Sequence, residues 1–243
     1  MIDVDGTLAI SQENTMPSSR VTQAINKAKD KIHIGVATGR PLFLIEDILS
    51  HLELSGPSIV NDGGIVIDIS TRKIHYERLL TKDHVDQAVT ILTSHKIPFY
   101  IHDNDKDILH TDDYAMERPI NIFTAGVHES IAERALQEIQ NLPMLHANKY
   151  ISWMNGLTGI LVSNAEATKQ HGIMEVAKAL NISTHEIIGV GDGYNDFPLL
   201  MACGLKIAMG NAVPELKEIA DYIAPTVEED GVADVIEKFI LNS

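Results

Sequence analysis

Short apolar runs and amphipathic stretches alternate along the first and last thirds of the chain. Apolar residues recur at intervals of three and four between positions 21 and 28, which predicts a helix, and a β-rich run covers positions 33–37. A second helix is expected after Pro41, with an inner face made of Leu44, Ile45, Ile48, Leu49 and Leu52. Strands that alternate with helices imply a parallel sheet covered on both faces. We therefore predict an α/β fold with a Rossmann-like, doubly wound parallel sheet.

A different pattern occupies the middle of the chain. The turn sequence Asn61-Asp62-Gly63-Gly64 precedes two short β-rich runs, at 65–69 and 73–76, which predict a hairpin. Further strands are expected at 98–102, 108–110, 149–154 and 157–162, and helices at 83–95 and 129–140. Because these elements do not alternate strictly, they predict a separate α+β insert. We place the insert at 64–164, so that 1–63 and 165–243 together form the core.

Two carboxylates lie in the first eight residues. Asp3 and Asp5 stand two positions apart on an extended segment before the turn at Gly6, so their side chains project to the same side. Like charges this close repel each other, and they stay together around a cation or when one carboxyl holds a proton. The pair therefore indicates a metal site or an acid/base site. The alternative is a solvated acidic N-terminus that leads into a turn.

Polar residues also follow other strands of the alternating part. Thr38 and Gly39 follow the second strand, the segment 192–196 follows the fourth, and Lys169 opens a helix near the return from the insert. In an open parallel sheet, ligands bind outside the carboxyl ends of the strands. Carboxylates in this number suit Mg²⁺, which prefers a few carboxylates together with waters and phosphate oxygens. The lysine and the threonine suit the remaining phosphate oxygens.

Other motifs that carry metal or cofactor chemistry do not fit. Neither Asp3 nor Asp103 begins a calcium loop, because Leu8 and Ile108 stand where such a loop needs glycine. A zinc-protease helix would need a second histidine at the position that Gly189 occupies. The glycines at 189–193 lack the spacing of the dinucleotide fingerprint. The sequence therefore implies neither zinc nor a dinucleotide.

The composition limits which binding partners and which cellular location can be expected. The chain has 243 residues, of which 44% are hydrophobic and 22% charged, and a net charge of -15. This negative charge repels nucleic acid and anionic lipid surfaces, so neither is expected as a partner, and no apolar run is long enough to span a bilayer. Cys203 is the single cysteine, which excludes an internal disulfide, and no secretory signal pattern is visible. We expect a cytoplasmic protein that acts on a small molecule, as a monomer or a homodimer.

Four ordered segments resemble the four motifs of the haloacid dehalogenase-like superfamily. They are Asp3-Val4-Asp5-Gly6-Thr7, Ala37-Thr38-Gly39-Arg40-Pro41, Lys169, and Gly191-Asp192-Gly193-Tyr194-Asn195-Asp196. Each motif alone is weak evidence, but the four together keep the order and spacing of the superfamily through the whole core. The insert resembles the large α/β cap of the Cof-type subfamily, subfamily IIB, which includes sugar-phosphate and phosphoglycolate phosphatases. Such a cap would choose the substrate.

This resemblance implies a phosphatase that works through a phosphoaspartyl intermediate. Asp3 would be the nucleophile, and Asp5 the general acid and then the general base. The presence of Asp5 favours phosphoester hydrolysis, because members that cleave carbon–halogen bonds lack it. Thr38, Gly39 and Lys169 would hold the phosphoryl oxygens, and Asn195 would orient Lys169 or the substrate. Mg²⁺ would be held by Asp3, the carbonyl oxygen of Asp5 and Asp192. Asp196 would either bind the ion itself or hold one of these ligands.

Several alternatives remain open at the level of sequence. Only Met1 and Ile2 precede Asp3, whereas the first strand of the superfamily normally supplies several apolar residues, so we expect either an upstream start or a shortened strand. A phosphotransferase or phosphomutase is the alternative within catalysis, and a non-catalytic phosphometabolite-binding protein is the alternative outside it. Arg40 could pair with core carboxylates. Residues that could contact the leaving group, although each is more often a surface or packing residue, are Arg72, Arg78, Arg118, Lys149 and Trp153.

Overall fold

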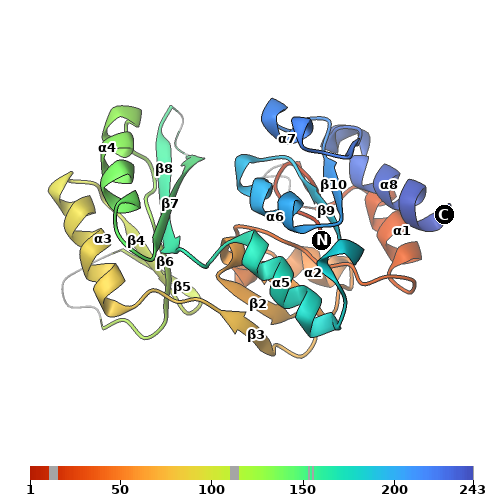
Figure 1. Ribbon diagram of the computed structural model, residues 1–243, viewed down its shortest axis with the longest axis horizontal. Helices are drawn as coiled ribbons and strands as arrows, with labels where there is room; N and C mark the ends of the chain where they lie inside the picture. The colour runs from red at the N-terminus through yellow and green to blue at the C-terminus, as the bar shows by residue number, and fades with distance from the viewer. Residues whose placement is uncertain (11–15, 110–114, 153, 155, 243) are drawn as a thin grey trace. The chain divides into compact units, whose positions relative to one another are not determined.

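The computed structural model describes residues 1–10, 16–109, 115–152, 154 and 156–242, and its contacts divide the chain into two units. The first unit, the core unit, comprises Met1–Glu77 and Thr168–Ser243, and the second, the insert unit, comprises Arg78–Ala167. Figure 1 shows the elements of both. Trp153, one of the residues that could contact the leaving group, lies outside the described residues. So does the last residue of the strand predicted at 108–110.

The core unit contains a parallel sheet. Strands β9 (Ile188–Gly191), β10 (Leu205–Ala208) and β11 (Tyr222–Ile223) pair in parallel, in the order β11-β10-β9. Parallel bridges extend the sheet, because Ile2 bridges both Val190 and Val36, and Ala37 bridges Ile59 in β1 (Pro57–Val60). Numbered along the chain, the six parallel segments therefore lie in the order 3-2-1-4-5-6. This is the order of a doubly wound Rossmann-like sheet, which confirms the predicted fold class.

Helices connect these segments. Helix α1 packs against α8, and α5 packs against α6 and β1; in Figure 1, β9 and β10 lie between the labelled α6 and α8. The buried side of α1 consists of the four residues whose spacing predicted the helix, at positions 21, 24, 25 and 28. The helices of this unit are α1 (Ser19–Ala28), α2 (Glu46–His51), α5 (Lys169–Leu180), α6 (Phe197–Ala202), α7 (Pro214–Glu218) and α8 (Gly231–Ile236).

The second predicted helix differs from expectation at its start. A short 3-10 turn covers Leu42–Leu44, and the α-helix begins only at Glu46. Ile45, Ile48, Leu49 and Leu52 are buried as predicted, but Leu44 is 53% exposed. The prediction that Leu44 faces the core is therefore wrong, because the 3-10 turn places it out of phase with the helix that follows.

The predicted hairpin belongs to the core unit. Strand β2 (Ile65–Asp68) pairs antiparallel with all four residues of β1, and β3 (Ile74–Glu77) pairs with β2. Ile65, Val66 and Ile67 are buried in this sheet. The contact boundary therefore falls after Glu77, not at position 64, because the hairpin continues the core sheet through β1.

The insert unit is an antiparallel sheet with two helices, an α+β arrangement as predicted. The strand order is β5-β4-β6-β8-β7, and apolar residues of the strands and helices form one buried cluster. The elements are α3 (Lys82–Ser94), β4 (Tyr100–Asp103), β5 (Lys106–Leu109), β6 (Pro119–Phe123), α4 (Glu129–Gln140), β7 (Leu145–Ile151) and β8 (Thr158–Asn164). The sequence pattern missed the central strand β6. Among the described residues, no helix of either unit is long and apolar enough to cross a membrane.

Candidate active site

The central segment of the core sheet ends at Asp3. The amide of Ile2 donates to the carbonyl of Gly35, and the amide of Asp3 donates to the carbonyl of Val190, at 3.0 and 2.9 Å. Asp3 therefore emerges between the two halves of the sheet, at its carboxyl edge, where the strand order reverses. This switch point is where open α/β sheets bind ligands.

The chain turns back directly after this segment. Gly6 has φ +78°, and a Cβ on it would lie 2.3 Å from Oδ2 of Asp192, so this position requires glycine. The hydroxyl of Thr7 donates to Oδ1 of Asp192 at 2.7 Å. The turn thus fixes the carboxylate of Asp192 against the loop that follows Asp3.

Lys169 brings two further carboxylates together. It is the first residue of α5, which Thr168 caps, and its side chain has 0% exposure. Its ammonium donates to Oδ1 of Asp3 and to Oδ1 of Asp196, both at 2.6 Å. Burial alone lowers the pKa of Lys169, but the charges of Asp196 and Asp3 outweigh it and raise that pKa above its usual value. The lysine is therefore a fixed positive charge.

The pKa of Asp3 shifts in the opposite sense from that of an ordinary ion-paired carboxyl. Burial is the largest cause and raises the pKa of Asp3 well above its usual value, and the charge of Asp196 raises it further. Lys169 opposes this rise without cancelling it. A second positive charge near Asp3 would favour its ionised form.

Asp196 organises the loop that follows β9. Its Oδ2 accepts hydrogen bonds from the amides of Asp192 and Gly193, at 2.9 and 3.0 Å, while its Oδ1 accepts from Lys169. Both oxygens of this fully buried carboxylate are therefore engaged. Asp196 therefore holds both Lys169 and Asp192 in place.

Asp5 points to a different partner. The buried guanidinium of Arg40 holds its carboxylate with two hydrogen bonds, from Nε to Oδ2 at 2.8 Å and from Nη2 to Oδ1. Arg40 therefore pairs with a carboxylate of the core, a possibility that the sequence had left open. The Asp5 side chain is 40% exposed, so it remains open to a ligand at the sheet edge.

The loop after the second parallel segment lies at the same edge. Thr38 is buried, and its hydroxyl accepts a hydrogen bond from the amide of Arg40 at 3.1 Å. Apart from its two chain neighbours, no described residue has an atom within 4 Å of the position that a Cβ on Gly39 would occupy, so the backbone there faces open space. A phosphate oxygen could approach this backbone closely.

The carboxylates fit a divalent cation. Asp3, Asp192 and Asp196 each offer an oxygen, and these oxygens lie within 4.8 Å of one another. Burial raises the pKa of Asp192 to about 6, which an adjacent cation would reverse. Arg40 holds the side chain of Asp5, and the family resemblance implies that the backbone carbonyl of Asp5, not this side chain, would bind the ion. Hard carboxylate oxygens are the donors that Mg²⁺ prefers.

Replacing Asp192 by asparagine is expected to stabilise the metal-free protein. The pKa of Asp192 rises from 3.8 to about 6 on folding, so this carboxyl lowers stability as the pH rises through that interval, and the loss persists above it. We expect Asp192→Asn to raise the midpoint of thermal unfolding at pH 7 by about 2–4 °C, with no rise at pH 4. Thermal unfolding without and with Mg²⁺ measures this. A lower midpoint than wild type at pH 7 without metal would contradict the assignment.

Sequence reasoning missed two residues of this site. Asp62, after β1, is partly buried beside Lys169, and burial raises its pKa to about 6. Thr7 holds Asp192. Asp62 is a carboxylate that follows the third parallel segment, and this position could have indicated a site residue. The sequence at 61–64 was interpreted only as a turn. Asn195 is exposed, and its side chain lies near the carboxylate of Asp62.

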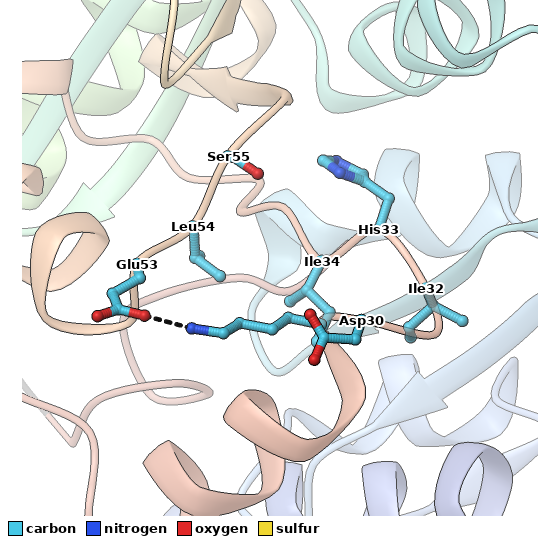
Figure 2. A pocket seen from close by; sticks show the side chains of 8 residues that line it. Asp30, Ile32, His33, Ile34, Glu53, Leu54 and Ser55 are labelled. Carbon is cyan, nitrogen blue, oxygen red and sulfur yellow. Dashed lines mark hydrogen bonds and ion pairs between the residues drawn. The ribbon is translucent and has the colours of Figure 1, made fainter.

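A cavity of about 220 Å³ lies elsewhere in the core unit (Figure 2). Its lining includes His33 and Ile34 before the second parallel segment, Ser55 before β1, and the ion pair between Lys29 and Glu53. These residues mark the amino ends of the strands, opposite to the edge that carries Asp3. The cavity is therefore not part of the candidate site.

Comparison with known proteins agrees with this geometry. Residues 1–138 and 102–236 match the family model of the haloacid dehalogenase-like hydrolases, and the chain belongs to this family. A Bacillus subtilis relative, the 5-amino-6-(5-phospho-D-ribitylamino)uracil phosphatase YcsE, is 30% identical over 99% of this chain and 94% of its own. The B. subtilis phosphatase YitU, with the same named substrate, is 27% identical over 98% of this chain and 96% of its own.

Solved structures share the fold. A haloacid dehalogenase-like hydrolase from B. subtilis superposes with a TM-score of 0.83 at 22% identity, over 98% of both chains. A sugar phosphatase of subclass IIB superposes with a TM-score of 0.79 at 21% identity, over 98% of this chain and 96% of that one. The resemblance inferred from the four motifs is thus confirmed, and the protein is a phosphatase of the Cof type.

Proposed function

We propose that this phosphatase is Mg²⁺-dependent, acts on small phosphorylated metabolites, and transfers the phosphoryl group to Asp3. The observation that carries the proposal is the environment of Asp3 at the switch point. One of its oxygens accepts a hydrogen bond from the buried Lys169, and Asp192 and Asp196 stand beside it. A carboxylate whose charge is screened in this way is a competent nucleophile towards phosphorus.

In the first step, an oxygen of Asp3 attacks the phosphorus atom in line with the leaving alcohol. The new bond joins that oxygen to phosphorus, the ester bond breaks, and protonated Asp5 gives its proton to the leaving oxygen. Arg40 occupies one lone pair on each oxygen of Asp5, so further lone pairs remain for this proton. Thr38, the Gly39 backbone and Lys169 stabilise the charge on the phosphoryl oxygens.

In the second step, water hydrolyses the phosphoaspartyl group. Asp5 now takes a proton from the water, the water oxygen bonds to phosphorus, and the bond from phosphorus to Asp3 breaks. Inorganic phosphate leaves, and both aspartates return to their starting states. Asp5 thus acts once as acid and once as base.

The acidic residues of the site would hold the cation. Among the described residues, no donor hydrogen-bonds to the second carboxylate oxygen of Asp3 or of Asp192, whereas both oxygens of Asp196 accept from Lys169 and the loop. We therefore assign Asp3, Asp192 and the carbonyl of Asp5 as ligands of the ion. Asp196 is either a further ligand or a residue that holds the other ligands in place. When bound, Mg²⁺ supplies positive charge that offsets the carboxylates and the phosphate.

For the substrate, we propose phosphate esters of small metabolites such as sugar phosphates or phosphoglycolate-like compounds. The named substrate of YcsE and YitU, a phosphorylated ribitylamino compound, is a further candidate, because both relatives cover nearly the whole chain. The predicted cap at 64–164, most of which forms the insert unit, is assigned to substrate choice.

Release of inorganic phosphate tests this proposal. The panel comprises sugar phosphates, phosphoglycolate, a phosphorylated ribitylamino compound and a chromogenic aryl phosphate, each with Mg²⁺ and with a chelator. We expect turnover that chelation abolishes and that Mg²⁺ restores. Phosphoryl transfer to an added sugar in preference to water would indicate a phosphotransferase instead. Tight binding of a phosphorylated ligand without any turnover would contradict catalysis.

A further inference from the structure

The sheet of the insert unit has two different faces. On one face the strands pack against α3 and α4, whose apolar residues belong to the same buried cluster (Figure 1). The strands β4, β6 and β8 contribute Ile101, Ile122 and Val162 to this cluster. Successive side chains of a strand point to opposite faces, so the neighbours of these residues lie on the other face. We call this other face the second face.

A row of polar side chains crosses the second face. His102 lies opposite Asp107 on one side and opposite Asn121 on the other. Asn121 in turn lies opposite Ser163, which lies opposite His146. Directly opposed residues of antiparallel strands have their Cβ atoms about 4.5–5.5 Å apart. The register therefore places one polar residue from each strand of the sheet side by side.

Within this row, Asn121 is not satisfied. His102 and Asp107 hydrogen-bond to each other, with 2.6 Å between Nδ1 and Oδ1. Asn121 is only 7% exposed, and its Oδ1 has no hydrogen-bond partner in the part of the chain that the structure describes. A buried carbonyl oxygen without a donor weakens the fold, and an apolar residue of the same size would avoid this loss. Stability alone therefore does not explain an asparagine here, whereas a donor from a ligand would satisfy the oxygen.

Aromatic side chains lie beside the polar row. Tyr100 and Phe123 each lie two positions from a residue of that row, so they share its face, and their rings stack with centroids 5.3 Å apart. Both are half-buried, and Leu109, at the edge of the same face, is 53% exposed. This edge is therefore open to solvent. Sites for small molecules typically combine apolar and aromatic side chains with a few placed polar groups, as this face does.

We infer that the carboxamide of Asn121 binds a hydroxyl group of the alcohol portion of the substrate, while Tyr100 and Phe123 pack against its carbon chain. A hydroxyl group both donates and accepts, so it can satisfy either polar atom of the carboxamide. Phosphate esters of polyols and sugars carry such hydroxyls along a carbon chain, and they are the substrate class that this face fits. This assignment rests on the proposed function, under which the insert unit chooses the substrate.

A matched pair of substrates tests the role of Asn121. Sorbitol 6-phosphate and hexyl phosphate have carbon chains of equal length, with and without hydroxyl groups. For the wild-type protein with Mg²⁺, we expect kcat/KM to be at least about 100-fold higher for sorbitol 6-phosphate, because a site with buried polar groups rejects an analogue that leaves them unpaired. Asn121→Leu removes the polar atoms and nearly keeps the size of the side chain, so it should reduce this preference about tenfold or more.

Two further variants control for effects on folding. Asn141→Leu makes the same replacement at an exposed position after α4 in the same unit, and should leave both substrates at wild-type kcat/KM. Asn121→Ala removes the same polar atoms without the branched leucine side chain, and should reduce the preference as Asn121→Leu does. The midpoint of thermal unfolding of Asn121→Leu should equal or exceed that of wild type, because an unsatisfied oxygen is removed.

Binding without turnover separates this assignment from the proposed mechanism. Calorimetric titration of Asp3→Asn with Mg²⁺ and each ester should show tighter binding of sorbitol 6-phosphate, and adding Asn121→Leu should remove most of the difference. Equal binding of the two esters by Asp3→Asn, an unchanged preference in both Asn121 variants, or equal losses on the two esters would each overturn the assignment. Failure of the proposed function would show differently, as a wild-type protein that releases phosphate from neither ester but still binds them with this preference.

Discussion

Asp3→Asn is expected to reduce turnover by more than about a thousandfold, the range found when a catalytic nucleophile is removed. An amide oxygen is a poor nucleophile, so no phosphoryl group can be transferred to position 3. The side chain keeps its size, and Lys169 keeps Asp196 as a partner, so the site should stay folded. Initial rates of phosphate release and the Kd for the substrate measure the two effects, and we expect the Kd to change little.

Asp47→Asn is the matched control for this experiment. Asp47 lies on the exposed first turn of α2, so its replacement should leave turnover and binding at wild-type values. If Asp3→Asn retained wild-type turnover, Asp3 would not be the nucleophile. If it lost binding and turnover in equal measure, Asp3 would contribute to substrate binding and not specifically to the chemical step.

Lys169→Met is expected to lower both activity and stability. Its loss removes a charge that, in the proposed mechanism, stabilises the transferring phosphoryl group, and we expect this to cost about 10²–10³-fold in kcat. It also leaves Asp3 and Asp196 buried without their shared cation. Removing one partner of a buried ion pair typically costs about 3–5 kcal/mol. Steady-state kinetics and urea unfolding at pH 7 measure the two losses.

The pH dependence of this stability loss has a definite sign. The pKa of Lys169 is raised on folding, so its stabilising contribution is complete below its ordinary pKa and is lost only as the pH rises through the raised value. At pH 7 the full loss is therefore expected. Since the pKa of Asp3 is already well above its usual value, acidification should neutralise that carboxyl and reduce the loss.

Lys29→Met serves as the control for Lys169→Met. Lys29 pairs with Glu53, whose side chain is 75% exposed, and exposed pairs contribute at most about 1 kcal/mol. The control should therefore retain full activity. A Lys169→Met protein as active and as stable as the Lys29→Met protein would contradict the account of the buried cluster.

The sequence predicted the core because its periodicities are strong. Alternating short apolar runs and amphipathic helices lead directly to a parallel sheet, and the carboxyl-edge rule then places the segments after Ile2, Ala37 and Gly191 together. The structure shows this convergence, since Lys169 contacts Asp3 across 166 positions of sequence. The chemical roles of these residues remain predictions.

Features that depend on backbone direction were not predictable. The sequence marked Asn61-Asp62-Gly63-Gly64 as a turn, but nothing in it showed that Asn61 and Asp62 adopt left-handed angles and that the carboxylate of Asp62 lies near Lys169. The pairing of Arg40 was equally open, because its contact with Asp5 depends on the path of two loops.

Two differences between the prediction and the structure have a similar origin. Strand β6 contains Asn121 between the buried residues Ile120 and Ile122 and begins at a proline, so its alternation is short and resembles a loop. The β2–β3 hairpin has the local pattern of any hairpin, and only its pairing with β1 assigns it to the core unit. In both cases the structure depends on pairing with another strand, which the local sequence pattern does not show.

Mass spectrometry of acid-quenched enzyme tests the central claim most directly. The protein is mixed with Mg²⁺ and a good substrate, quenched within the first turnovers, and digested, so that a phosphorylated peptide can be detected. The account predicts that the N-terminal peptide carries one phosphoryl group on Asp3 and that Asp3→Asn carries none. Turnover with no phosphorylated peptide at any quench time, or phosphorylation at another residue, would contradict it.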